Sequence, residues 1–83
     1  MKKTISKASK MIRTARLRKG WTQRELGLML GHSYGNFIGM LESGSAQIPV
    51  GIIVPISNLL GLDPKKLLRE VMICRHPDLA KYL

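Results

Sequence analysis

Hydrophobic residues recur along most of this chain at intervals of three or four, the spacing that places them on one face of an α-helix. Ala8, Ile12 and Ala15 share one such face, and Leu26 and Leu30 share another. Glycine, proline and helix-capping residue types separate these periodic stretches. The pattern therefore predicts an all-α fold built from five helical segments.

The first three segments have clear ends. The first covers residues 6–19, and the second covers residues 23–30 after the capping-box pattern of Thr22 and Glu25. Ser33 is expected to cap the third, residues 34–43. We expect this third helix to turn Phe37, Ile38 and Leu41 inward, and to turn Gly35, Asn36, Gly39 and Ser43 outward. The residues expected to end the three helices in a left-handed conformation are Gly20, Gly31 and Gly44.

Two helices and a tail follow. The fourth helix is expected over residues 51–60, because Pro55 is tolerated only in or near a first helical turn. The dipeptide Asp63-Pro64 supplies a cap and a first helical residue for a fifth helix, which continues to Met72. Residues 76–83 form either one short helical turn or a frayed end.

Composition and charge add a class of partner to this picture. With 83 residues, 45% of them hydrophobic, the chain fits one domain with one modest core. Fourteen Lys and Arg against five Asp and Glu give a net charge of +9, a field that gathers polyanions such as nucleic acid. The charge is concentrated before the first acidic residue, Glu25, in Lys2, Lys3, Lys7, Lys10, Arg13, Arg16, Arg18 and Lys19.

Other function classes find little support. Basic residues break every candidate signal peptide, and the longest apolar run, residues 52–56, contains a proline and is too short to span a membrane. Cys74 is the single cysteine, and neither it nor His76 and the distant His32 match a metal-ligand or Cys–His catalytic pattern. We therefore expect no metal, no cofactor, no enzymatic activity and no membrane association, in a protein of the cytoplasm.

Several stretches together resemble the helix-turn-helix regulators of the Cro and lambda-repressor type. The likeness covers roughly residues 10–70 and is carried by Thr22-Gln23-Arg24-Glu25-Leu26-Gly27, Leu30-Gly31-His32-Ser33, Phe37-Ile38, Leu41-Glu42-Ser43-Gly44, Arg16, Ile48-Pro49 and Leu59-Leu60-Gly61-Leu62. It implies a five-helix DNA-binding domain over residues 1–83. In that domain residues 1–8 are a basic arm or helix start, residues 22–43 the helix-turn-helix, and residues 75–83 a tail that can contact a second copy.

The chain departs from this family pattern at three places. Between Gly31 and Glu42 it is one residue longer than the commonest members, so the register of the third helix is not carried over directly. Gly35 and Gly39 stand where members usually carry polar side chains that contact bases, which implies sparse base readout. Ser43 stands where the family usually has a basic or amide residue.

The resemblance places the N-terminal part of the third helix in the major groove, where base pairs show distinct donors and acceptors. The candidates for base contacts are Ser33, Tyr34, Asn36 and Gly39. Asn36 is the strongest, since an amide can bind adenine through two hydrogen bonds. The alternatives are a solvated Asn36 and a partly packed Tyr34.

Phosphate contacts are expected at the start of the second helix and along the basic arm. The candidates are Thr22, Gln23, Arg24, Lys2, Lys3, Lys10 and Ser43. Thr22 is expected to act first as a cap, and Gln23 and the lysines have the alternative of a solvated surface position. The resemblance further implies a structural ion pair between Arg16 and Glu42, and Trp21 is interpreted as a core residue.

The resemblance implies a dimer that binds a palindromic operator through paired half-sites and represses transcription, in a protein of bacterial or phage origin. We expect its interface among Leu67, Val71, Cys74, Leu79, Tyr82 and Leu83. We expect no second domain to follow, so the resemblance is expected to be nearer to Cro than to the two-domain repressors. The alternatives are an antitoxin that also binds a partner protein, an interaction module without base readout and, last, a cationic bundle at anionic membranes.

Overall fold

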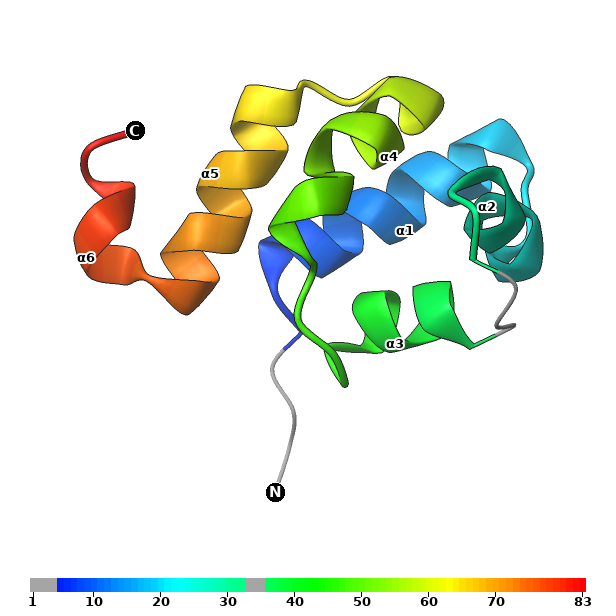
Figure 1. Ribbon diagram of the computed structural model, residues 1–83, viewed down its shortest axis with the longest axis horizontal. Coiled ribbons are helices and arrows are strands. Elements are labelled where there is room, and N and C mark those ends of the chain that lie inside the picture. The colour runs from blue at the N-terminus through cyan, green and yellow to red at the C-terminus, as the bar shows by residue number, and fades with distance from the viewer. Residues whose placement is uncertain (1–4, 33–35) are drawn as a thin grey trace.

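Helices form the regular structure of the computed structural model, which describes residues 5–32 and 36–83 (Figure 1). They are α1 (Lys7–Lys19), α2 (Gln23–Met29), α3 (Phe37–Ser43), α4 (Ile53–Leu60), α5 (Pro64–Arg75) and α6 (Pro77–Ala80), with a 3₁₀ turn, η1 (Val50–Ile52), directly before α4. No strand occurs in the two described ranges. The all-α prediction is confirmed, and of the two alternatives for the tail the short helical turn, α6, is the one found.

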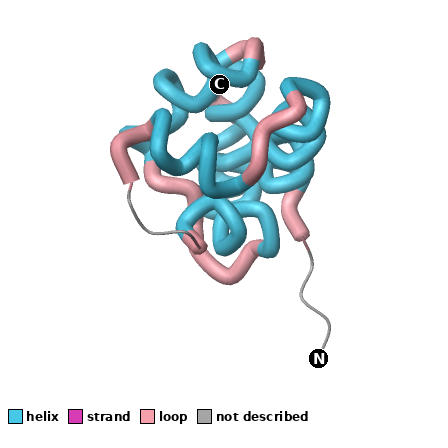
Figure 2. The backbone as a smooth tube through the Cα atoms, turned by 90° about the vertical axis from the view of Figure 1, so that its right-hand side faces the viewer, coloured by secondary structure: helices cyan, strands magenta, loops and turns pink. Residues whose placement is uncertain are grey.

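Local sequence signals set most of the helix ends. Ser6 caps α1 by accepting a hydrogen bond from the Ser9 N–H at 3.2 Å, and Asp63 caps α5 by accepting one from the Lys65 N–H at 2.9 Å. Left-handed glycines, with φ between 70° and 82°, stand at four turns: Gly20, Gly31, Gly44 and Gly61. A residue with a Cβ is strained in this conformation, so glycine allows the chain to reverse within a few residues. The loops between α1 and α2 and between α4 and α5 are correspondingly short (Figure 2).

The third helix starts later than expected. Its first residue is Phe37, three residues beyond the predicted start, and Asn36 occupies the N-cap position without a side-chain hydrogen bond to the helix. The expected cap, Ser33, lies outside the described residues. The boundary was wrong because both serine and asparagine are favoured N-cap residues, so capping preference alone did not choose between them.

The fourth and fifth helices also differ at one end each. Residues 50–52 form η1, so α4 begins at Ile53, two residues later than expected. Pro55 then falls in the first turn of α4, where a missing N–H costs no intrahelical hydrogen bond. α5 continues past Met72 to Arg75.

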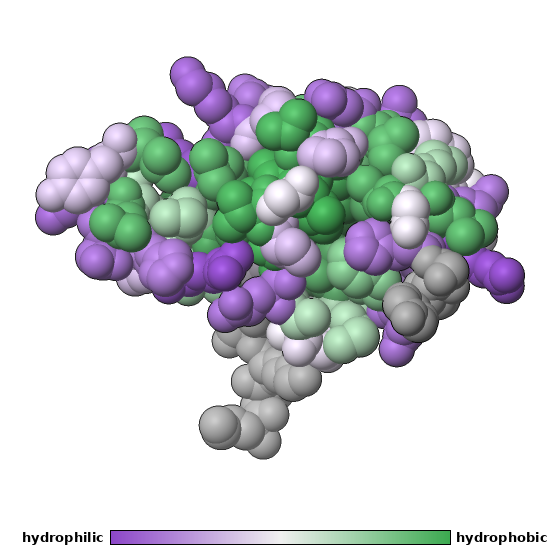
Figure 3. Space-filling model, in the orientation of Figure 1, coloured by the Kyte–Doolittle hydropathy of each residue, from purple (hydrophilic) through white to green (hydrophobic). Residues whose placement is uncertain are grey.

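The core lies where α1 meets α3, α4 and α5. Its largest buried apolar side chains are Ile12, Leu26, Ile38, Leu41, Ile56 and Leu67. Val71 joins them from α5, one helical turn beyond Leu67. On the face seen in Figure 3, hydrophobic residues gather over the middle of the molecule and hydrophilic residues surround them. The helices thus share one apolar centre, against which α2 and α3 are held.

Two of the three residues considered above for metal binding, His32 and Cys74, lie in surroundings that do not form a metal site. The ring of His32 stacks on Phe37, with centroids 4.0 Å apart. Cys74 is a free thiol on α5. Across residues 5–32 and 36–83, no cluster of three or more His, Cys, Asp or Glu side chains is placed to hold a metal ion. In the same ranges, each helix is too short or too polar to cross a membrane.

Candidate nucleic-acid interface

The start of α2 is fixed by a reciprocal pair of hydrogen bonds. The Glu25 N–H donates to the Thr22 hydroxyl at 3.0 Å, and the Thr22 N–H donates to the Glu25 carboxylate at 2.8 Å. This is the capping box that the sequence predicts. The backbone hydrogen bond from Thr22 lowers the pKa of Glu25, and the Thr22 hydroxyl lowers it further. The hydroxyl of Thr22 is therefore engaged with its own helix, on an exposed part of the surface.

One buried carboxylate joins the first three helices. Arg16 of α1 donates to Glu42 of α3 through Nε at 2.7 Å and through Nη2 at 3.1 Å, and both side chains are at least nine-tenths buried. Gln23, the first residue of α2, donates from Nε2 to the same carboxylate at 3.1 Å. The remaining Arg16 nitrogen, Nη1, donates to the Trp21 carbonyl at 2.8 Å. The structure thus brings together Arg16 and Glu42, the pair that the resemblance implies, and adds Gln23 to it.

This network sets the orientation of α2 and α3. Hydrogen bonds tolerate only a narrow range of angles, so a carboxylate with donors from two other helices restricts how those helices rotate against each other. The apolar face of α3, with Ile38 and Leu41, is buried in the core, and Glu42 beside it is buried as well. The opposite face of α3 is left at the surface in a defined direction.

The outward face of α3 consists of Asn36, Met40 and Ser43, all of which are exposed. Asn36, the strongest candidate for a base contact, lies at the N-terminal end of this face. Ser33 and Tyr34 lie outside the described residues. Ser43 lies at the other end, where its hydroxyl lies 3.3 Å from the Met40 carbonyl and 2.9 Å from the Ser45 hydroxyl.

Gly39 differs from the other base-contact candidates. It is half-buried rather than outward-facing, because the side chain of Gln23 lies against it. A Cβ added at Gly39 would lie 3.0 Å from Oε1 of Gln23. The expectation that this position faces outward was wrong, since the outward surface here is shared between two helices.

The basic residues of the predicted phosphate contacts fall into two groups. Arg24 on α2 and Lys10 on α1 are exposed. Lys2 and Lys3 lie outside the described residues.

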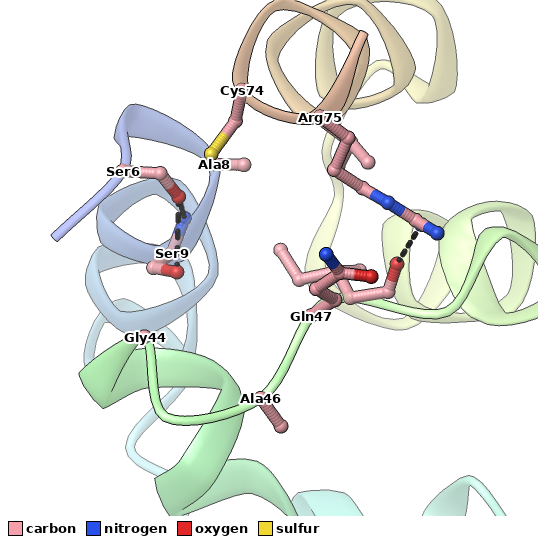
Figure 4. Close-up of a pocket in the computed structure, with 10 residues that line it drawn as sticks. Ser6, Ala8, Ser9, Gly44, Ala46, Gln47, Cys74 and Arg75 are labelled. Atoms are coloured by element: carbon pink, nitrogen blue, oxygen red, sulfur yellow. Dashed lines mark hydrogen bonds between the residues drawn. The ribbon is translucent and has the colours of Figure 1, made fainter.

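Ser6 and Ser9, from the start of α1, face a cavity of about 220 Å³ that the end of α3 and the end of α5 also line (Figure 4). The chain therefore enters α1 beside the C-terminal end of α3.

The expected dimer residues do not form one surface. Leu67 and Val71 are only 0% and 2% exposed and belong to the core, so they are not available to a second copy. Cys74 is exposed, but it lies beside the cavity that the start of α1 also lines and that α6 does not line (Figure 4). The remaining three are exposed around α6 and the tail: Leu79 (49%), Tyr82 (77%) and Leu83 (57%). The first two were misplaced because helical periodicity shows that residues share a face, but not which partner that face meets.

Some contacts of this site were not predicted from the sequence. The ring of His32 stacks on that of Phe37, and Gln23 reaches Glu42 across nineteen positions of sequence. The only signal for the second contact is a glutamine at the first position of α2, which equally suits a surface residue. Trp21 is half-buried against the core, as interpreted, and Lys19 lies over its ring at 5.9 Å.

In this chain α2 and α3 are two short, consecutive helices. One face of α3 is fixed by buried bonds, and its other face is exposed. This arrangement defines the class of helix-turn-helix domains. A family model described as helix-turn-helix matches residues 12–67, well over half of the chain. The chain belongs to this family, in its Cro and lambda-repressor type, which is a family of DNA-binding transcription regulators and not of enzymes. Comparison with curated proteins and with solved structures found no match.

Proposed function

We propose that this protein binds operator DNA as a dimer, reads its sequence with α3 in the major groove, and represses transcription by occupying a promoter. The observation that supports this best is the exposed face of α3, held at a fixed angle by the buried carboxylate of Glu42. Only the major groove is wide enough for such a helix, and only there does each base pair have its own pattern of donors and acceptors. The resemblance implies the cytoplasm of a bacterial or phage-infected cell as the setting.

Within this proposal Asn36 is the base-reading residue. Its amide carries both a donor and acceptors, and adenine offers the matching pair, N7 and N6–H₂, in the major groove. Arg24 at the start of α2 binds a phosphate, as do Lys10 and the lysines at positions 2 and 3. Phosphate contacts fix the register of the protein on the duplex but carry no sequence information.

Selection of bound duplexes from a random pool tests this division of roles. Asn36→Ala is expected to change the preferred sequence at one base pair. Arg24→Ala is expected to weaken all duplexes alike and to lower the salt slope of binding by about 0.9, the value for one phosphate contact. Asn58→Ala, an exposed asparagine on α4, is the matched control and should leave both quantities unchanged. Selection of no preferred sequence by the wild-type protein would contradict the proposal.

The dimer is proposed to form through α6 and the tail, where Leu79, Tyr82 and Leu83 are exposed. Hydrophobic residues reach the surface over this part of the molecule, on the left of Figure 3. A two-fold axis here gives two copies of α3, which bind half-sites about one helical turn apart. The selected operator should therefore be a palindrome.

Sedimentation equilibrium tests the dimer directly. Leu79→Asp places a charge in the proposed interface and should give a monomer that loses its preference for the palindrome over a half-site. Val54→Asp is the matched control, since Val54 is 56% exposed on α4 and lies outside the proposed interface. A dimer unaffected by Leu79→Asp would remove α6 from the proposal.

The same experiments separate the two alternatives. An antitoxin would copurify with a tightly bound partner protein and still select an operator. An interaction module without base readout would bind every duplex equally. The observation that favours this second alternative is Gly39. It is half-buried and, as a glycine, gives α3 no projecting side chain at this position.

A further inference from the structure

The contact between Gly39 of α3 and Gln23 of α2 joins the two helices of the motif. A Cβ built at Gly39 would lie 3.0 Å from Oε1, 3.6 Å from Cδ and 3.7 Å from Nε2 of Gln23. The shortest of these distances is tighter than about nine in ten contacts that real Cβ atoms make, so the amide would have to shift by a few tenths of an ångström. The amide of Gln23 therefore occupies the space into which a side chain at position 39 would project.

The other end of the same amide fixes its orientation. Glu42 accepts a hydrogen bond from Nε2 of Gln23 at 3.1 Å and is bound on its other side by Arg16. A carboxylate has only acceptors, so the amide nitrogen of Gln23, and not its oxygen, faces Glu42. The oxygen, Oε1, is then the atom directed toward Gly39.

Position 39 lies at the edge of the outward face of α3. Asn36, Met40 and Ser43 are exposed on that face, Glu42 is buried behind it, and Gly39 is half-buried between the two. The amide oxygen of Gln23 reaches this edge from a neighbouring helix. It brings a hydrogen-bond acceptor to the place where α3 itself has no side chain.

We propose that Gly39 is a specificity-determining residue: its missing side chain allows the amide oxygen of Gln23 to face DNA as an acceptor. In the major groove the complementary donors are the exocyclic amino groups of adenine and cytosine. Gln23 is the reading residue, and Gly39 acts through it as a positioning residue. This inference rests on the proposed function, since it assumes that α3 enters the major groove.

The positioning part is tested without DNA. Gly39→Ala, Gln23→Ala and the double variant are unfolded in urea, and the coupling between the two changes is taken from the four unfolding constants. Removal of a mid-helix glycine ordinarily lowers the unfolding constant about two- to fivefold. We expect this gain in stability for Gly39→Ala only in the Gln23→Ala background. In the presence of Gln23, the new methyl group displaces the Gln23 amide from Glu42.

Gly27→Ala is the matched control for this measurement. Gly27 is also within a helix, but a Cβ there would lie 3.6 Å from Ile38 Cγ1 and 3.7 Å from the His32 carbonyl, which are ordinary contact distances. The gain at Gly27 should therefore be the same with and without Gln23. Equal gains for Gly39→Ala in both backgrounds would overturn the positioning role.

The reading part is tested by selecting duplexes with the same four proteins. The wild type should prefer adenine or cytosine at one base position, and Gly39→Ala should reduce that preference about fivefold or more, the lower end for a base contact. Gln23→Ala should lose preference at the same position, and the double variant should lose no more. Loss at different positions, or no loss, would overturn the reading role. A wild type with no preference anywhere would overturn both this role and the proposed function, while the unfolding measurement would still decide the positioning.

Discussion

The helix-turn-helix corner and the C-terminal pair α5–α6 are stabilised in different ways. In the corner, the Glu42 carboxylate receives hydrogen bonds from Arg16 and Gln23, so polar contacts join α1, α2 and α3. In α5, apolar residues such as Leu67 pack into the core, and its polar contacts with other elements include the hydrogen bond from Arg75 to the Ile48 carbonyl at 3.0 Å and the ion pair of Glu70 with Lys7 of α1 at 3.7 Å. The two regions have the same kind of secondary structure but different kinds of contact.

The two kinds of contact differ in how strongly they fix the orientation of a helix. Hydrogen bonds depend strongly on angle, whereas hydrophobic contact is non-directional. In the proposed function α3 enters a groove in one orientation, which directional contacts favour, while a helix that supports the core needs only to remove apolar surface from water. Four predictions test this comparison.

The largest effect is expected from Glu42→Ala. The change leaves the buried Arg16 guanidinium without its partner, so the free energy of unfolding should fall by about 3–5 kcal/mol. Urea unfolding followed by circular dichroism measures it. The matched control is Lys7→Ala, which removes an ion pair with Glu70 at 3.7 Å and should cost less than about 1 kcal/mol. It truncates the exposed partner, since the side chain of Lys7 is 73% exposed and that of Glu70 is 19% exposed. Similar losses in both variants would show that the corner has no special dependence on its ion pair.

The second effect is expected from Leu67→Ala in α5. Truncation of a fully buried leucine leaves a cavity and should lower the free energy of unfolding by about 2–5 kcal/mol. Leu17→Ala is the control, because Leu17 is 57% exposed on α1 and lies outside the proposed dimer interface, so its truncation should change stability little. If Leu67→Ala is neutral, the assignment of this part of α5 to the core is wrong.

A smaller effect is expected from Thr22→Ala at the start of α2. Loss of the hydroxyl that accepts the Glu25 N–H should lower the free energy of unfolding by about 1 kcal/mol. Thr14→Ala is the control, since Thr14 lies exposed within α1, where alanine has the higher helix propensity. Thermal unfolding of the two variants should move in opposite directions. A shift of the same sign in both would argue against the cap.

The smallest effect is expected in the pH dependence. The pKa of Glu25 is lowered in the folded protein, so its contribution to stability is present above the usual carboxyl range and is lost as pH falls through the folded pKa. Glu25→Gln should therefore flatten the stability profile between about pH 5 and pH 2. NMR titration of the Glu25 carboxyl measures the shift itself. An unshifted titration would mean that the capping box is open in solution.

The sequence was sufficient for the parts of the fold that depend on neighbouring residues. The capping box of Thr22 and Glu25, the start of α5 at Asp63, and the left-handed glycines that follow α1 and α3 all depend on interactions within a few positions. The start of α3 was three residues off, because Ser33 and Asn36 are both good cap residues. The N-cap preferences of Ser33 and Asn36 take no account of the packing of Phe37 on His32.

The site was less predictable, because its contacts depend on the angles between helices. The pairing of Arg16 with Glu42 came from resemblance, and nothing in the sequence indicated that Gln23 would join them. The half-buried position of Gly39 depends on where α2 crosses α3. Leu67 and Val71 were assigned to an interface because their periodicity marks an apolar face without showing that this face meets the core.

The short glycine-ended connections bear on how fast the chain reaches its native state. Several helices pack against the helix that follows them in the chain, as in α2 with α3, α4 with α5, and α5 with α6, so many native contacts join residues close in sequence. Closing such short loops costs little chain entropy, and helical domains with this topology fold in microseconds to milliseconds. The packing of α2 against α3 can therefore re-form quickly after a transient opening.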